Sequence, residues 1–512
     1  MKLPGFEKLS TTFRIERCVA VVACLLFTPL VHGASFQVSV LAAPERTREQ
    51  SVLPVRAEPG GAADLMVVSV TDTSREYQLY RARAEGYLAL DDARRLADDI
   101  VVLDDGRIAG RDVVIAFGAG SAWVFNPYTG ERTHLLDITS LYSTPIRTIV
   151  PRLDLLRDVN GDGRDDIIVP GFAGYQVSTQ QEDGAFGPLV TAFAPPLVEI
   201  SFNDYPFYQP RQAYQADMDL DGQGELVFWL DDGLNAYAFN ALGDLEAEAV
   251  RPGGKPPIDF GSMDDMSISM RDEDQSDASA RALLDIGDVD GDSVADLLTL
   301  TVDSQGVFRK TTTYELWQGT AGEGEISFGE GPSARIESKG FQFEAEGEDM
   351  DGDGQVDMMI STVEIGIGKI LSALITGSVR IDLNFYRMRD GQYPARPDLR
   401  KDVTATLDLG RGDFFFPTVL LTDVDGDGVS DLLLQEGEEK MKIFTGLGDE
   451  RLFSRRSIDI TAPMASDPDL VDVIDLNGDG RSDIVMRLDK TGEPRRVVVL
   501  LSADATQAVT AR

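Results

Sequence analysis

Short apolar runs that open with an acidic residue recur along the chain. They are rich in Val, Ile and Leu and soon reach polar or turn-forming residues, as in "DIIVP" from Asp166. Short, often β-branched runs bounded by turn residues are typical of buried strands rather than helices. The pattern predicts an all-β protein with eight repeated units. The opening acids are Asp64, Asp112, Asp166, Glu225, Asp296, Asp357, Asp431 and Asp483.

An acidic loop precedes six of these runs, and the first copy reads "DVNGDGRDDIIVP". Each copy has Asp, then Asp or Asn, then Asp at positions one, three and five, and an acid at position nine. Successive copies start 52 to 74 residues apart. A four-stranded propeller blade takes about 40 to 50 residues, so each interval suits one blade with loop insertions. We therefore expect a single β-propeller of seven or eight four-stranded blades, with eight favoured by the number of units.

The two N-terminal units keep the strand but lack the loop's ligands. "DDGRIAGRDVVIAFG" has Gly106 and Ile108 at positions three and five, and "GGAADLMVVSV" keeps only its acid. We expect both blades to lack metal. The last unit ends after "RRVVVLL", so "FQVSVLAA" near the N-terminus is predicted to supply its missing strand and close the ring. Closure removes exposed sheet edges.

The acidic loops have the chemistry of calcium sites. Calcium takes six to eight oxygen ligands at about 2.3 to 2.6 Å, and magnesium's rigid octahedron suits such a cage less well. Alternating carboxylates converge on a tight turn, the position-seven carbonyl adds an oxygen, and glycine at position six permits the turn. About six Ca²⁺ sites are predicted. Their ligands at positions one, three, five, seven and nine are Asp158, Asn160, Asp162, Arg164 and Asp166; Asp217, Asp219, Asp221, Gln223 and Glu225; Asp288, Asp290, Asp292, Val294 and Asp296; Asp349, Asp351, Asp353, Gln355 and Asp357; Asp423, Asp425, Asp427, Val429 and Asp431; and Asp475, Asn477, Asp479, Arg481 and Asp483.

The loops differ from EF-hands, which need a bidentate Glu at position twelve and a helix on each side. Strand-like runs follow each loop instead, so a calcium sensor of that type is excluded. The loop from Asp288 is the least regular, because Ser293 replaces its position-six glycine. Position twelve holds Val169, Phe228, Thr299, Ile360, Leu434 and Met486.

The net charge of the chain limits which binding partners are expected. The chain has 87 acidic and 47 basic residues and a net charge of −40. Such a charge disfavours nucleic acids and anionic membranes as partners and favours divalent cations. Hydrophobic residues make up 43% of the chain, enough for a packed core rather than a disordered chain.

The N-terminus predicts export. Basic residues before position 18 precede an apolar stretch from Cys18 to Val31, which is too short to span a bilayer and reads as a signal peptide cut after Gly33. No membrane span is expected. The mature chain would lack cysteine, so calcium is expected to take the stabilising role of disulfides. The predicted layout is a signal peptide at 1–33, an N-terminal segment at 34–59 and a propeller at 60–512, in the periplasm, at the cell surface or outside the cell.

The Asp-x-Asp-x-Asp-Gly-x-x-Asp core of the loops resembles the FG-GAP and VCBS repeats of integrin α-subunit propellers and of bacterial exported proteins. The resemblance covers about residues 60 to 512. It implies calcium held inside the blades, on the face opposite the usual ligand surface. It also implies seven blades, where the units of this chain number eight.

Three functions are compatible with these features. The first is a monomeric ring that binds or adheres to a protein or glycan ligand through a calcium-stabilised scaffold. The second is a calcium-dependent, lyase-like polysaccharide-degrading enzyme, and the third is a pilus or envelope assembly subunit. Catalysis is disfavoured by the single histidine outside the signal peptide, His134, and by the lack of a nucleophile motif.

Two further stretches leave alternatives open. The aromatic residues of "NDYPFYQPRQAY" (203–214) either stack on a ligand at the rim or pack within a blade. The apolar positions of residues 368–376 have helical spacing, which predicts a short amphipathic helix that covers a blade or docks a partner.

Overall fold

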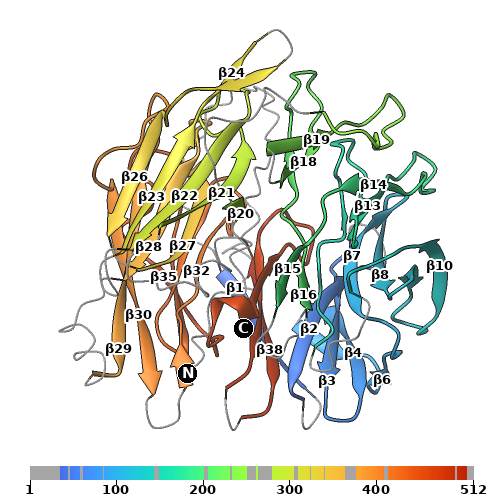
Figure 1. Cartoon of the computed structure of the whole chain (residues 1–512). Helices are drawn as coiled ribbons and strands as arrows, with labels where there is room; N and C mark the ends of the chain where they lie inside the picture. Colours follow the sequence, from blue (N-terminus) through green and yellow to red (C-terminus); the bar gives the residue numbers. More distant parts are fainter. Residues whose placement is uncertain are drawn as a thin grey trace, which may run out of the picture.

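Eight β-sheets follow one another along the chain and form an eight-bladed propeller (Figure 1). The computed structural model describes residues 35–503 apart from 44–46, 58–60, 85, 143–148, 201–205, 231–232, 251–260, 263–278, 305–309, 323–324, 340, 364–375, 409–412 and 491–492. The predicted signal peptide and all but Thr376 of the predicted helix lie outside these residues.

Blades one to four contain the first half of the strands. The sheet of blade four has only three strands in the described part of the chain, although an isolated bridge between Ala236 and Val250 follows its third strand. Blade one comprises β2 (Glu49–Val55), β3 (Asp64–Val70), β4 (Arg75–Arg83), β5 (Gly86–Ala89) and β6 (Arg94–Arg95), and blade two comprises β7 (Val102–Ile108), β8 (Arg111–Phe117), β9 (Ser121–Phe125) and β10 (Arg132–Asp137). Blade three comprises β11 (Leu156–Arg157), β12 (Asp166–Pro170), β13 (Gly174–Ser178) and β14 (Val190–Phe193), and blade four comprises β17 (Tyr214–Ala216), β18 (Glu225–Leu230) and β19 (Gly233–Tyr237).

Blades five to eight contain the second half of the strands, and two of them carry a fifth strand. Blade five comprises β20 (Gly261–Ser262), β21 (Ser279–Gly287), β22 (Asp296–Ser304), β23 (Lys310–Trp317) and β26 (Ala334–Lys339), and blade six comprises β27 (Phe341–Glu348), β28 (Asp357–Val363), β29 (Ser378–Tyr386), β30 (Leu399–Asp408) and β31 (Asp413–Phe415). Blade seven comprises β32 (Val419–Thr422), β33 (Asp431–Gln435), β34 (Lys440–Phe444) and β35 (Ile458–Thr461), and blade eight comprises β36 (Val471–Ile474), β37 (Asp483–Leu488), β38 (Arg496–Ala503) and β1 (Ser35–Ala42).

Three short elements lie outside the blades. Two are separate two-stranded hairpins, and one is a single 3-10 turn. None of the helical segments in the described part of the chain has the length and apolar character needed to span a bilayer. The elements are β15 (Leu197–Ile200) with β16 (Pro206–Gln209), β24 (Gly319–Ala321) with β25 (Ile326–Phe328), and η1 (Pro468–Leu470).

The repeated apolar runs form the second strand of each blade, except in blade five, where the short β20 makes the run the third strand. β3, β12, β28 and β33 are buried along their whole length. Both faces of these strands are covered by neighbouring blades, which explains why the sequence shows continuous apolar runs rather than an alternating pattern. The prediction that eight acids open eight strands is confirmed, except that Asp112 is the second residue of β8.

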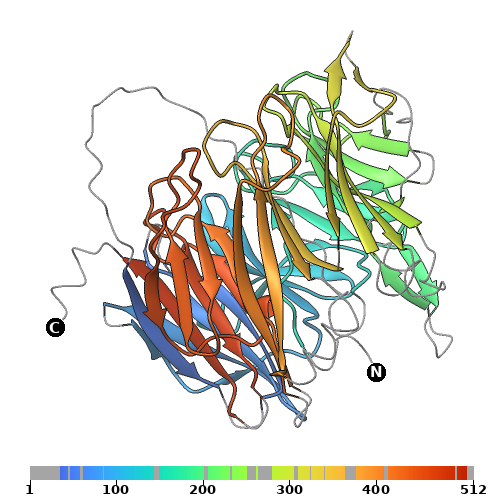
Figure 2. The same ribbon diagram turned by 90° about the vertical axis from the view of Figure 1, so that its left-hand side faces the viewer.

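Hydrophobic clusters join every neighbouring pair of blades, and together they close the ring. The closing cluster contains Leu41 and Val485 of blade eight and Val52 of blade one. β1 pairs antiparallel with β38 over the full length of both strands, from Ser35↔Ala503 to Ala42↔Arg496. Figure 2 shows the blue first blade beside the red last blade.

This architecture decides between the two predicted blade numbers in favour of eight. It also moves one boundary, because the first blade begins at β2 and the propeller therefore starts before residue 60. The strand opened by Asp64 needs β2 as its partner, and the acid-led pattern does not mark that first strand.

Candidate metal centres

The six predicted loops occupy the same place in six blades, directly before the strand that the position-nine acid opens. This place lies between the first and second strands, except in blade five, where the short β20 precedes the pair. The first strands of all blades run in the same direction in a propeller, so these loops lie on one face of the ring. We call this the loop face. The loops connect β11 to β12, β17 to β18, β21 to β22, β27 to β28, β32 to β33 and β36 to β37.

The position-one carboxylate organises the backbone of each loop. In the loop from Asp158, one carboxylate oxygen accepts the Gly161 amide at 2.7 Å and the other accepts the Gly163 amide at 2.8 Å. The amides of positions four and six thus point inward at one carboxylate. The same two bonds recur at Asp217, Asp288, Asp349, Asp423 and Asp475.

Positions four and six both adopt the left-handed conformation. Gly161 has φ of 77° and Gly163 has φ of 83°. The sequence analysis identified the need for glycine at position six only. The signal for position four was present, since five of the six copies carry glycine there. The two exceptions are Leu220 at position four (φ 66°) and Ser293 at position six (φ 68°), and each carries backbone strain.

The position-nine acid anchors the loop to its blade. In blade three, Asp166 accepts the Val159 amide on Oδ2 at 3.1 Å and the Gln180 amide on Oδ1 at 2.8 Å. The sequence analysis missed this role, because the second donor lies beyond the third strand. Asp296, Asp357, Asp431 and Asp483 make both bonds, and Glu225 accepts the Met218 amide.

Burial raises the pKa of the position-nine acids above the usual range of carboxyl groups. The pKa of Asp166 is raised to about 7 and that of Asp357 to about 8. The neighbouring loop carboxylates raise both further, whereas the backbone amides lower them. The buried position-nine carboxylates therefore lie among other acids without full compensation by positive charge, which a divalent cation can supply.

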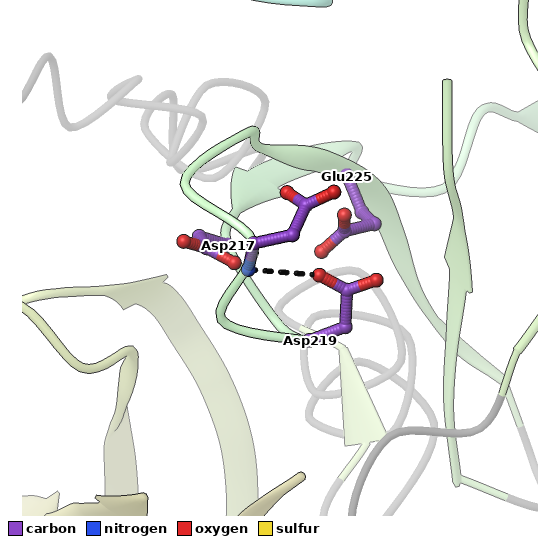
Figure 3. Close-up of side chains that lie close together, drawn as sticks. Asp217, Asp219 and Glu225 are labelled. Atoms are coloured by element: carbon purple, nitrogen blue, oxygen red, sulfur yellow. Dashed lines mark hydrogen bonds between the residues drawn. The ribbon is translucent and has the colours of Figure 1, made fainter. Parts of the chain in front are cut away.

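Four of the six loops bring at least three acids within 4.8 Å of one another. Figure 3 shows the carboxylates of Asp217, Asp219 and Glu225 turned toward a common point. The clusters are Asp217, Asp219, Asp221 and Glu225; Asp288, Asp290 and Asp296; Asp349, Asp351 and Asp353; and Asp423, Asp425 and Asp431.

Two position-three carboxylates have a buried oxygen without a hydrogen-bond partner among the described residues. These atoms are Oδ1 of Asp351 and Oδ1 of Asp425. The pKa of Asp425 is raised to about 6 by burial and by the neighbouring Asp427 and Asp423. An unpaired buried carboxylate oxygen is costly, and a cation bound by the loop would remove that cost. The residues present therefore fit a hard divalent cation with oxygen ligands.

Basic side chains modify two of the loops. Arg164 at position seven contacts Asp162 at position five through its guanidinium. In the loop from Asp349, Nη1 of Arg387 lies 2.7 Å from Oδ2 of Asp351, and both side chains are 8% exposed. These contacts already neutralise part of the negative charge, so metal affinity is expected to differ between loops.

The loops from Asp158 and Asp475 differ because asparagine occupies position three. Nδ2 of Asn160 lies 3.1 Å from Oδ2 of Asp162, and Asn477 makes the same contact with Asp479. The structure thus gathers fewer acids in these two loops than in the other four. At position seven, the amides of Arg164, Gln223, Val294, Gln355, Val429 and Arg481 donate to the position-five carboxylates, and their carbonyls remain predicted ligands.

In blades one and two, arginines lie beside the strand-opening acid. Asp64 accepts the Ala82 amide and the Tyr128 hydroxyl, and Arg81 lies 3.7 Å away. Asp112 lies 3.3 Å from Arg107 and 3.8 Å from Arg56. Asp64 still accepts a backbone amide where the other ligands are missing, so this structural role is separable from metal binding.

Residues 423–486 match the model of the FG-GAP-like repeat. This stretch runs from the loop of blade seven through β37 of blade eight, which is one complete loop-to-loop unit. The protein is a β-propeller with an FG-GAP-like repeat. No curated protein sequence matches the chain.

Several solved structures are similar to the propeller in fold. An Agrocybe aegerita lectin that recognises non-reducing terminal N-acetylglucosamine is 14% identical, with a TM-score of 0.34 and coverage of 89% of this chain and 85% of the lectin. The V. cholerae biofilm matrix protein Bap1 is 14% identical, with a TM-score of 0.25 and coverage of 92% and 88%. A Bacteroides uniformis protein described as a 6-phosphogluconolactonase is 9% identical, with a TM-score of 0.30 and coverage of 80% and 96%. Similarity at this level carries no information about a ligand of this protein.

Proposed function

We propose that the protein is an exported binding scaffold in which calcium on the loop face stabilises the propeller and the opposite face receives a protein or glycan ligand. One observation carries the proposal. Each of four loops brings three or four acids close together, and two of these loops leave a buried carboxylate oxygen without a hydrogen-bond partner among the described residues. Calcium would supply the missing charge and complete the coordination of these oxygens.

The proposed metal role is structural rather than catalytic. Each loop is tied by its position-one and position-nine acids to the backbone of its own blade. Carboxylates held in this way have little freedom to engage a substrate. Extracellular calcium modules bind with affinities of roughly 0.1 to 1 mM, so ~1 mM calcium adds about 0.4 to 1.4 kcal/mol per site. The four clusters together would add about 2 to 6 kcal/mol.

Calcium titration of the chelated protein, followed by thermal melting, tests this proposal. We expect at least four binding events and a melting temperature several degrees higher in about 1 mM calcium than in chelator. Asp425→Asn should remove or weaken one binding event, because it alters the carboxylate with the unpaired oxygen.

Asp98→Asn is the matched control. It makes the same chemical change at a side chain that is 73% exposed and far in sequence from any loop, and it should leave calcium binding unchanged. A melting temperature that does not respond to calcium would rule out the scaffold role.

A further inference from the structure

The β15–β16 hairpin is an insertion on the face opposite the loop face. β12 starts at the loop face with Asp166, so its other end, the turn into β13 and the end of β14 lie on the opposite face. The hairpin lies between the end of β14 and the start of β17, which leads back to the next metal loop. In Figure 1, β15 and β16 lie well below β24, which begins beside the metal loop of blade five.

The base of this hairpin is held firmly. Arg211 is 8% exposed and donates from Nε to the Pro195 carbonyl at 2.9 Å, which joins the two ends of the insertion. Its own carbonyl accepts the Tyr175 hydroxyl at 2.5 Å, which fixes it to blade three. The hairpin is therefore presented in a defined position rather than as a loose loop.

One side of the hairpin exposes apolar side chains. Val198 and Tyr208 are register partners, and they are 55% and 40% exposed. Phe172, in the turn between β12 and β13, is 48% exposed and packs edge-on against Tyr208 with ring centroids 5.1 Å apart. We call Phe172 and Tyr208 the aromatic patch. Exposed clusters of this kind mark binding sites in soluble proteins.

The aromatic stretch predicted from residues 203–214 thus divides between its two alternatives. Tyr214 is 4% exposed and packs in the core, as a blade strand requires, whereas Phe207 and Tyr208 are 57% and 40% exposed. Tyr205 lies outside the described residues. The sequence could not separate these roles, because exposure depends on where the hairpin leaves the blade.

A small cavity of about 200 Å³ lies on the same face, beside this turn and hairpin. Its wall includes Pro170, two residues before Phe172, and Gln212, three residues after β16 ends. Tyr142 also lines it. Asp154 and Arg157 contribute opposite charges 3.3 Å apart, so this pair adds no net charge to a wall that is otherwise mostly apolar.

We propose that the cavity and the aromatic patch together bind a neutral saccharide, with one sugar ring in the cavity and a neighbouring ring against Phe172 and Tyr208. Apolar ring faces of sugars stack on aromatic side chains, while their hydroxyls need paired donors and acceptors such as Tyr142, Asp154 and Gln212. A volume of about 200 Å³ is below that of sites for drug-sized ligands, as expected for one ring.

Charge favours a neutral saccharide over an acidic one. The chain carries a net charge of −40, which repels polyanions, and the Asp154–Arg157 pair leaves no uncompensated cation in the cavity wall. The inference rests on the proposed binding function and assigns it a ligand class and a location.

The test uses the calcium-loaded protein on an array of neutral and acidic oligosaccharides, followed by calorimetric titration with each saccharide bound. We expect binding to at least one neutral oligosaccharide. Phe172→Ala and Tyr208→Ala should each weaken it about tenfold or more, as for anchor residues of an interface. Tyr142→Phe, which removes only the hydroxyl, should weaken it less without changing the melting temperature.

Leu242→Ala is the matched control. Leu242 is 74% exposed and lies on the loop face, where the Gly243 carbonyl accepts from Asn160, so its removal should leave saccharide binding intact. The inference is overturned if no neutral saccharide binds, if acidic saccharides bind as strongly, or if the three substitutions have no effect. A peptide array provides a further test. The inference is also overturned if Phe172→Ala and Tyr208→Ala abolish binding of the protein to peptides but leave its binding to saccharides unchanged. A protein that calcium stabilises but that binds no saccharide would refute this inference alone, whereas a protein that calcium does not stabilise would refute the proposed function.

Discussion

Within each loop, every position has a distinct physical task. Position one collects the inward amides, positions four and six supply the left-handed turns, and position nine fastens the loop to its blade. Only at positions three and five are the side-chain oxygens left largely free to bind a cation. Asp351 and Asp425, both at position three, are accordingly the described loop residues with an unpaired buried oxygen.

The strained Ser293 gives a prediction at this scale. Its φ of 68° is unfavourable for a residue with a Cβ atom, so Ser293→Gly should relieve about 1 to 2 kcal/mol of strain in the folded state. The greater freedom of glycine in the unfolded chain offsets part of this, which leaves a net gain of about 0.5 to 1 kcal/mol. Urea unfolding measures this gain.

Ser457→Gly is the control, because Ser457 is not among the residues with positive φ and should lose stability when glycine replaces it. Equal effects of the two substitutions would contradict the strain assigned to Ser293. Leu220→Gly should gain less than Ser293→Gly, because Leu220 also packs against the core between blades four and five.

In each strand–loop–strand unit, the protonation of one acid depends on the charges of the others. The buried position-nine acid at the start of the second strand feels the carboxylates of the loop before it, so the unit titrates together. This coupling predicts different responses of stability to pH with and without calcium.

In the chelated protein, the pKa values of the position-nine acids are raised to about 6 to 8, against an ordinary value of 3.8 for Asp and 4.5 for Glu. The folded state then holds more protons than the unfolded state between about pH 4 and pH 8. Stability must therefore fall as pH rises through this window. Calcium replaces the protons, so its stabilising effect should grow over the same range.

Thermal melting at pH 5, 6, 7 and 8, with and without calcium, measures both trends. The melting temperature should decline with pH in chelator and should decline less, or rise, in calcium. A chelated protein that becomes more stable from pH 5 to pH 8 would contradict the assigned pKa directions.

At the scale of the whole molecule, the ring depends on a strand from the other end of the chain. β1 covers β38 with eight residue pairs, and its Leu41 reaches the cluster that joins blades eight and one. Removing residues 35–42 would expose the edge of β38 and part of this cluster.

We expect that deletion to lower the melting temperature and to cause association, visible as larger species in size-exclusion chromatography. A chain that ends at Ala503 serves as the control and should remain a monomer. If the deleted form keeps the stability and size of the parent, β1 does not close the ring in solution.

The acid-led strands, the acidic loops and the count of eight units could be predicted from local sequence patterns. Both kinds of signal are local: a buried second strand needs a continuous apolar run, and a cation loop needs oxygen-bearing residues at alternate positions. The position-four turn could have been found in the same way, since Gly161 and its counterparts repeat in register with the acids.

Contacts between side chains that are far apart along the chain could not be predicted from such patterns. Arg387 reaches Asp351 from the residue that follows β29, and Gln180 gives its amide to Asp166 from beyond β13. The exposure of Tyr208 depends on Arg211, which fixes the hairpin outside the blade. Such contacts follow from the placement of whole strands and blades, and local sequence patterns carry no record of that placement.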